Sequence, residues 1–335
     1  MKTVLAALVL GTALHIHAAE TDNFSTRAMG FIDAGNLINE RSQAYLEEAL
    51  SNLNTQGGCD LSEKSEVALY EEMAKYFSNH KTGALVRSLL YTDEFPKIVT
   101  PLRESIYKEW SVHEGYLLGG KNAANSPLAI SPVIQVGGVK VGIDKFEHMF
   151  GMGFKYFEGY YLKGKELKSI LKNGIFREKT ALGGNILATG VFSYGDLAAN
   201  FNGMRFWNHV LQKRDDVLGK DYNIGPYVVC SEGKWKVNSE RPLIFENYVD
   251  HSMNESVNCS KFATKSGLKK FQDSMVRLNF VGKGDEKACP VVAEELDEVI
   301  KKYAVPMPGD EKGPNIGHWI INSEGTGKVS YLNMF

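Results

Sequence analysis

The sequence predicts an α+β protein in which helices dominate and the strands form short hairpins. Apolar residues recur three and four positions apart over most of the chain, which is the period of amphipathic helices. Two short runs of apolar residues flank glycine-bearing turns, which is typical of β-hairpins. Of the 335 residues, 43% are hydrophobic and 23% are charged, so a disordered or fibrous chain is excluded.

The N-terminus has the pattern of a secretory signal peptide. Lys2 precedes an apolar stretch at 4–14, and the small residues Ala18 and Ala19 follow. We expect residues 1–19 to form this signal, with cleavage after Ala18 or Ala19. The apolar stretch is too short to span a bilayer, and no later stretch reaches the roughly 18 apolar residues that spanning needs. The sequence therefore predicts a secreted or periplasmic protein with no integral membrane segment once the signal is removed.

Export gives the cysteines a structural meaning. An even number of cysteines in an oxidising compartment predicts one or two disulfides, and the sequence leaves three complete pairings open. No C-x-x-C pair is present, so a zinc cage or a thioredoxin-type site has no support. The cysteines are Cys59, Cys230, Cys259 and Cys289.

The charge balance argues against nucleic acid as a partner. The formal net charge is −2 and the pI is near 6.5. Without a basic excess, the chain has no obvious source of the phosphate neutralisation that dominates nucleic-acid binding. The sequence also lacks a phosphate-binding loop and a dinucleotide fingerprint, and we expect no cofactor.

Residues 20–125 are predicted to form an N-terminal helical region. Asp60 and Glu63 have the spacing of a capping box, and Thr100-Pro101 suits the start of a further helix. Glycine, asparagine and serine dominate residues 117–128, which predicts a loop. The apolar residues of the predicted helices lie at 37–53, 67–76 and 102–110.

Residues 126–304 are predicted to form the core, and residues 305–335 an extended tail. Gly137-Gly138 predicts a two-residue hairpin turn, because glycine accepts the positive φ of primed turns. Ser193 and Asp196 form a capping box at a helix start. The other predicted elements are an aromatic helix from Asp144 to about Tyr161, a helix from Lys165 to about Glu178, a glycine-bearing connection at 179–193, a hairpin at Tyr227–Asn238, a helix at 268–278 and a helix from Pro290 to about Tyr303.

Asp144, Glu147 and His148 lie together at the start of the aromatic helix. Asp144 and His148 are four residues apart, so the carboxylate could orient the imidazole for base catalysis or metal binding. We favour a plainer interpretation, in which Asp144 and Glu147 cap the helix and His148 is a hydrogen-bonded interior histidine. No H-E-x-x-H or paired H-x-H motif follows the signal peptide.

Glu178 lies at the end of a predicted helix, ahead of Gly183-Gly184. In a cleft with apolar neighbours, desolvation would disfavour the charged form of this glutamate, which is how a carboxyl group is kept protonated for general-acid work. The alternative is a solvated surface side chain between Arg177 and Lys179. Spacing alone favours the surface interpretation.

The run Thr189–Asn200 is the most unusual segment. Ser193 is not in a G-x-S-x-G elbow, which disfavours a serine nucleophile. The stretch from Gly190 to Tyr194 offers backbone donors and an aromatic face near a helix start, which suits sugar or peptide binding. A capped helix start with close packing at Ala198-Ala199 has equal weight.

A further acidic cluster contains Asp250 and Glu255. We favour another helix cap at Asp250. A metal-dependent hydrolase remains a separate hypothesis, with Asp144, His148, Asp250 and His251 as its ligands.

Several of these runs together resemble one family. They are 141–148, Glu178, 188–200, Phe206-Trp207, Cys230, Trp235, Tyr248-Val249-Asp250, Glu255 and Asn258-Cys259. Over about residues 30–290 the chain resembles secreted bacterial lysozyme-like proteins, a group that includes the lysozymes of predatory bacteria that cut deacetylated peptidoglycan. Two positions depart from the family pattern: Glu147 stands where a small residue is expected, and Asn173-Gly174 interrupts the helix leading to Glu178.

The resemblance implies a lysozyme-like core at 126–304 and cleavage of peptidoglycan glycan strands, by hydrolysis or transglycosylation. Glu178 matches the catalytic glutamate, and no metal is implied. The expected substrate-binding residues are Thr189, Phe192, Ser193, Tyr194 and Asp196, with Asp144 and His148 in supporting roles. Asp196 or Asp144 could also face the ammonium group of a glucosamine. A non-catalytic protein that binds the cell wall is the alternative from another class.

Overall fold

The computed structural model describes residues 19–60, 62–120, 123, 129–179, 188–280 and 288–330. The predicted fold class is confirmed, because helices dominate and the strands form small sheets. The α-helices are α1 (Gly35–Thr55), α2 (Glu63–Met73), α3 (Ala84–Tyr91), α4 (Asp144–Phe150), α5 (Met152–Phe157), α6 (Leu167–Lys179), α8 (Tyr194–Leu211), α9 (Lys265–Arg277), α10 (Ala293–Lys302) and α11 (Gly317–Ile320). Shorter helical turns are η1 (Leu102–Glu104), η3 (Glu158–Leu162, a π-helix), η4 (Lys220–Tyr222), η5 (Phe245–Asn247) and η6 (His251–Met253).

The strands form four small sheets within the described parts of the chain. β1 (Glu20–Thr21) pairs in parallel with β2 (Ile130–Ser131), and the predicted glycine hairpin joins β3 (Val133–Val136) to β4 (Val139–Gly142). The second predicted hairpin joins β6 (Val228–Ser231) to β7 (Lys234–Val237). The remaining sheet has the order β5 (Val191–Phe192), β8 (Lys261–Phe262) and β9 (Gly327–Lys328).

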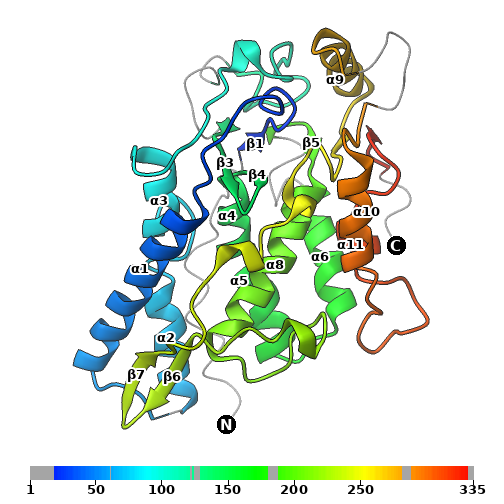
Figure 1. Ribbon diagram of the computed structural model, residues 1–335. Coiled ribbons are helices and arrows are strands. Elements are labelled where there is room, and N and C mark those ends of the chain that lie inside the picture. Colours follow the sequence, from blue (N-terminus) through cyan, green and yellow to red (C-terminus); the bar gives the residue numbers. More distant parts are fainter. Residues whose placement is uncertain are drawn as a thin grey trace.

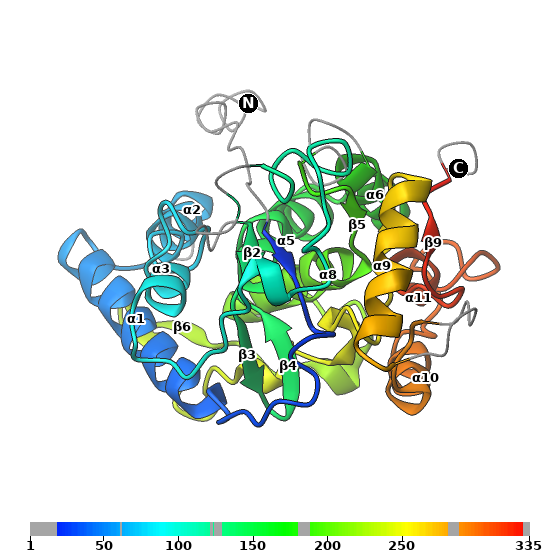
Figure 2. The same ribbon diagram turned by 90° about the horizontal axis from the view of Figure 1, so that it is seen from above.

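Helix α8 is the centre of the molecule (Figures 1 and 2). In both views α1, α2 and α3 lie to one side of it, and α9, α10 and α11 lie to the other. Nearly every residue of α8 is buried, and α4 and α5 pack against it. Glycine makes the α5–α8 approach possible, since a Cβ on Gly153 would come within 2.6 Å of the Gly203 Cα.

Two predicted helices differ from the structure in whether they are interrupted. The aromatic helix is divided at Gly151 into α4 and α5, and it ends in the π-helical turn η3. The expected interruption at Asn173-Gly174 is wrong, because α6 runs unbroken to Lys179. Gly174 is needed there for packing, since a Cβ would lie 1.6 Å from the Tyr156 hydroxyl oxygen.

The predicted extended tail is also wrong over its described part. The segment after residue 305 contains α11 and β9, and α11 packs against α6 and α8. Ile316 and Ile320 are buried in the main core. The proline, glycine and charged residues of this segment favoured the prediction of an extended tail, although its apolar residues pack into the core.

Several helix starts differ from the sequence-based expectation. Ser62, not Asp60, caps α2 and accepts the Ser65 N–H. Thr100-Pro101 precedes only the short turn η1, and the expected helix over 102–110 does not form. Helix α10 begins at Ala293, three residues after Pro290.

The prediction of one or two disulfides is confirmed, and the structure supplies the pairing that the sequence left open. Cys59 is bonded to Cys230, and Cys259 to Cys289. The first links the segment after α1 to β6, and the second links the segment before β8 to the approach to α10. Among the described residues, none of the helices has the length and apolar character needed to cross a membrane.

Candidate active site

A buried lysine lies at the centre of the candidate site. The Lys145 ammonium group is 2.6 Å from an Asp144 carboxylate oxygen, 2.8 Å from Asp196 and 2.7 Å from Glu255. All four side chains are at most 2% exposed. Burial alone would lower the pKa of Lys145, but the three carboxylates raise it well above its ordinary value, so the ammonium form is held.

Asp144 and Glu147 do not form the predicted helix cap. Helix α4 has no side-chain cap at Ile143. The Asp144 carboxylate instead accepts a hydrogen bond from the Thr21 hydroxyl at 2.6 Å, and Glu147 accepts the His80 backbone N–H at 2.9 Å. Both carboxylates therefore make contacts distant in sequence.

His148 is an interior histidine, as the plainer interpretation predicted. Its side chain is 4% exposed, with Nδ1 3.2 Å from the Asn200 amide oxygen and Nε2 3.2 Å from an Asp196 carboxylate oxygen. Burial would raise the pKa of Asp196, but His148 and Lys145 hold it below its ordinary value. Asp144, His148 and Asp196 thus do meet, around a lysine that sequence reasoning did not weigh.

Ser193 joins the helix start to the acidic groups. Its hydroxyl accepts the Asp196 backbone N–H at 3.1 Å, which confirms the predicted cap of α8. The same hydroxyl donates to Glu255 Oε1 at 2.9 Å. The Ser193 backbone N–H donates to Glu178 Oε1 at 3.3 Å. One residue therefore connects Glu178 to the charged cluster.

Glu178 is buried, contrary to the surface interpretation. It lies in the last turn of α6, and the residue is 5% exposed. Arg177, whose charge would oppose protonation, is exposed. The connection at 180–187, with the predicted Gly183-Gly184 turn, lies outside the described residues.

The N-terminal strand reaches the same cluster from far away in sequence. The Thr189 hydroxyl donates to Glu20 Oε1 at 2.6 Å, and both residues are at most 1% exposed. Burial, together with the charges of Glu255 and Asp196, raises the pKa of Glu20 well above its ordinary value. Burial and neighbouring carboxylates likewise raise the pKa of Glu255, to about 7.

The aromatic residues of the run differ in exposure. Phe192 is 1% exposed and packs edge-on against Tyr194, with ring centroids 5.0 Å apart. Tyr194 keeps part of its ring at the surface, where the Lys261 ammonium lies 6.0 Å from the ring centroid. Of the two rings, Tyr194 is thus the one that a ligand can reach in this conformation.

The four metal ligands hypothesised from the sequence are divided between two places. Asp144 and His148 lie at the cluster around Lys145, and Asp250 and His251 pair with residues of α10. Oxygens of Asp144, Asp196 and Glu255 lie within 4.8 Å of one another, which would suit a hard cation, but the Lys145 ammonium contacts all three. Asp250 caps η6, as predicted, and pairs with Lys302. His251 faces Glu295 instead, with Nδ1 3.3 Å from its carboxylate oxygen.

Lys145, Glu20 and the role of Glu255 were missed by sequence reasoning. A signal was present for Lys145, since it lies in a helix whose neighbouring positions are apolar or aromatic. A lysine there must be paired when the helix is buried. Glu20 carried no such signal, because it adjoins the expected cleavage site.

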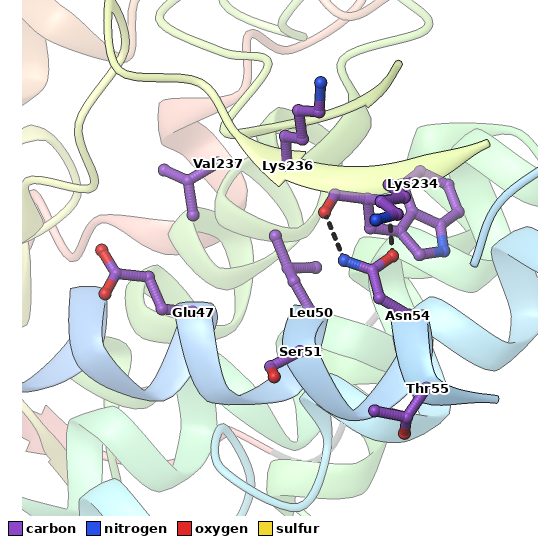
Figure 3. A pocket seen from close by; sticks show the side chains of 9 residues that line it. Glu47, Leu50, Ser51, Asn54, Thr55, Lys234, Lys236 and Val237 are labelled. Atoms are coloured by element: carbon purple, nitrogen blue, oxygen red, sulfur yellow. Dashed lines mark hydrogen bonds between the residues drawn. The ribbon is translucent and has the colours of Figure 1, made fainter. Parts of the chain in front are cut away.

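A separate groove of about 580 Å³ lies between α1 and the β6–β7 hairpin (Figure 3). The Asn54 amide spans this junction, donating to the Trp235 carbonyl oxygen and accepting the Trp235 N–H, each at 2.8 Å. Its lining includes Glu47, Lys234 and Lys236 and none of the site residues. The groove lies where α1 packs against the hairpin, and Glu178 is not among its lining residues.

Comparison of the chain with protein-family models, with curated proteins and with solved structures gave no match.

Proposed function

We propose that this protein is an exported lysozyme-like glycosidase that cuts the glycan strands of peptidoglycan, with Glu178 as the general acid. Export removes the N-terminal signal by cleavage after Ala18 or Ala19. The observation that carries the proposal is the burial of Glu178 at the end of α6, with the Ser193 N–H on one carboxyl oxygen. The resemblance to secreted lysozyme-like proteins supports the same assignment.

Two features of the structure act in opposite directions on Glu178: burial disfavours its charged form, and the Ser193 N–H favours it. A carboxyl group that is 5% exposed loses most of the solvation of its charged form.

In the proposed reaction, the Glu178 carboxyl group donates its proton to the glycosidic oxygen as the bond to the sugar breaks. The sugar passes through an oxocarbenium-like state, and a water molecule or the substrate's own acetamido group completes the reaction. The Ser193 N–H stabilises the Glu178 carboxylate left after donation. Tyr194 is the aromatic face for the sugar.

Asp144 and Asp196 act as supports in this proposal. Both are buried and paired with Lys145, so direct contact with a glucosamine ammonium would require this ion cluster to open. Thr189 and Ser193 hold the backbone between α6 and α8 in place through Glu20 and Glu255.

The test is digestion of purified sacculi, acetylated and N-deacetylated, with mass spectrometry of the soluble products. Glu178→Gln keeps the shape of the side chain but cannot donate a proton, so product release should fall by about 10²–10⁴-fold. Glu166→Gln, at an exposed glutamate just before α6, is the matched control and should keep full activity.

Two results would contradict the assignment. Full activity of Glu178→Gln would remove its catalytic role. Binding of wild-type protein to sacculi without soluble products would favour the non-catalytic wall-binding alternative. Digestion in the presence of EDTA tests the alternative of a metal-dependent hydrolase, because the proposed mechanism predicts that EDTA leaves activity unchanged.

A further inference from the structure

The first described residues of the chain are built into the candidate active site. Ala19 is 5% exposed, Glu20 1% and Thr21 0%. β1 is paired with β2, and the Asn23 amide oxygen accepts the backbone N–H of Glu255 at 3.1 Å. The segment that follows the expected cleavage site is therefore an internal part of the fold.

This part of the site holds more carboxyl groups than cations. Asp144, Asp196 and Glu255 surround Lys145, and Glu20 lies near enough for the charges of Glu255, Asp196 and Lys145 to act on it. Two buried carboxyl oxygens, Glu20 Oε2 and Glu255 Oε2, have no hydrogen-bond partner among the described residues. An unpartnered buried carboxyl oxygen is costly, so a second cation with several N–H donors would fit here.

We propose that this second cation is the chain's own α-ammonium group, created by cleavage after Ala18 or Ala19 and bound by Glu20 and Glu255. The inference rests on the export and cleavage proposed above. A leader-cleaving peptidase hydrolyses the peptide bond with one water molecule. The leader ends in a carboxylate, and the released amine takes up the proton.

Cleavage changes both the charge and the donor count at this position. For cleavage after Ala19 the new amine is the nitrogen of Glu20, which in the uncleaved chain is an amide whose single N–H donates to the Ala129 carbonyl oxygen at 3.1 Å. A free α-amino group has an ordinary pKa of about 8, and nearby carboxylates favour its charged form. The new ammonium offers three donors where the amide at the same nitrogen offers one. Processing would thus complete the cluster that supports Ser193 and, through it, Glu178.

The experiment compares N-terminal variants of the full chain after export. Mass spectrometry first identifies the mature N-terminus, and Gly-Ser is then inserted directly after the cleavage site to displace the ammonium. We expect the insertion to lower Tm by about 2–4 °C at neutral pH. In a Glu20→Gln background the same insertion should lower Tm by less than half as much. Glu40→Gln, at an exposed glutamate of α1, is the control background, in which the insertion should lower Tm by the full amount.

The outcomes separate this inference from the proposed enzyme activity. Equal Tm values with and without the insertion would overturn the inference, as would a mature chain that begins elsewhere. If EDTA lowers Tm and the insertion does not, the position would be assigned to a metal ion instead. If Glu178→Gln keeps its activity while the insertion still lowers Tm, the enzymatic proposal fails and the ammonium assignment stands.

Discussion

Replacement of Lys145 by methionine removes the one side chain among the described residues whose cation contacts all three of Asp144, Asp196 and Glu255. At an effective dielectric constant of about 20, one such contact at 2.7 Å is worth ~6 kcal/mol before desolvation is subtracted. Desolvation offsets most of this, and breaking a buried pair by removing one partner costs about 3–5 kcal/mol. For a chain of this length we expect Tm to fall by about 6–10 °C at pH 8.

The pH dependence of this loss distinguishes charge from packing. Lys145 lowers the pKa values of Asp196 and Glu255, so in its absence both rise and acid neutralises these two carboxyl groups in the folded state. The Tm deficit should therefore be largest above pH 7 and should shrink as the pH falls toward 5. Circular dichroism melts at a series of pH values measure it.

Lys269→Met is the matched control, because this exposed lysine of α9 pairs with Asp273 in solvent. Its removal should cost no more than about 0.5 kcal/mol. Should Lys145→Met fail to fold, adding Glu255→Gln restores part of the charge balance and should recover a cooperative melt. A Tm within 2 °C of wild type at pH 8, or a deficit that grows on acidification, would refute the reasoning.

Three further predictions concern Glu255, Ser193 and Gly203. The pKa of Glu255 is about 7 in the folded protein and near 4.5 when unfolded, so the folded state binds more protons between these values. Stability should therefore fall by about 1–3 kcal/mol as the pH rises from 4.5 to 7, and Glu255→Gln should reduce this slope in the same melts. Ser193→Ala removes the α8 cap and the hydroxyl bond to Glu255. The free energy of unfolding, measured in urea, should fall by about 1–2 kcal/mol, and kcat should fall more than KM changes. An unchanged kcat would contradict the link between Ser193 and Glu178. Gly203→Ala places a Cβ 2.0 Å from the Met149 carbonyl oxygen and should cost about 1–3 kcal/mol by thermal melts. Gly30→Ala, where a Cβ would meet no atom within 4 Å and the glycine does not have a positive φ, is the control and should leave stability nearly unchanged.

Local periodicity was sufficient for most of the fold. Apolar spacing predicted α1, α6, α8 and α9, and paired positive-φ glycines predicted the turn between β3 and β4. The breaks were harder, because a glycine inside a helical pattern has two meanings. At Gly151 the helix is divided, while at Gly174 the absence of a side chain lets Tyr156 pack against an intact helix. Only the neighbouring element decides between them.

The parts of the candidate site that rest on a local sequence motif were predictable. The Ser193 cap and the interior position of His148 followed from spacing, but the carboxylates at Asp144 and Glu147 did not cap their helix. Their partners, Thr21 and His80, lie far away in sequence, and a local pattern carries no information about such partners. At the start of α4, the acidic residues that local spacing assigns to a helix cap therefore make long-range contacts instead.

The position of Glu178 depends on this long-range assembly. Its helix ends beside Ser193 only if β5 and α8 are held in register, and Ser193 is held by Glu255 from a later segment. Glu255 in turn shares Lys145 with Asp196. A substitution anywhere in this chain of contacts should therefore alter the proton affinity of Glu178 as well as stability. The pH–activity profile is the measurement that separates these two effects, because a purely structural loss lowers activity at every pH without moving the profile.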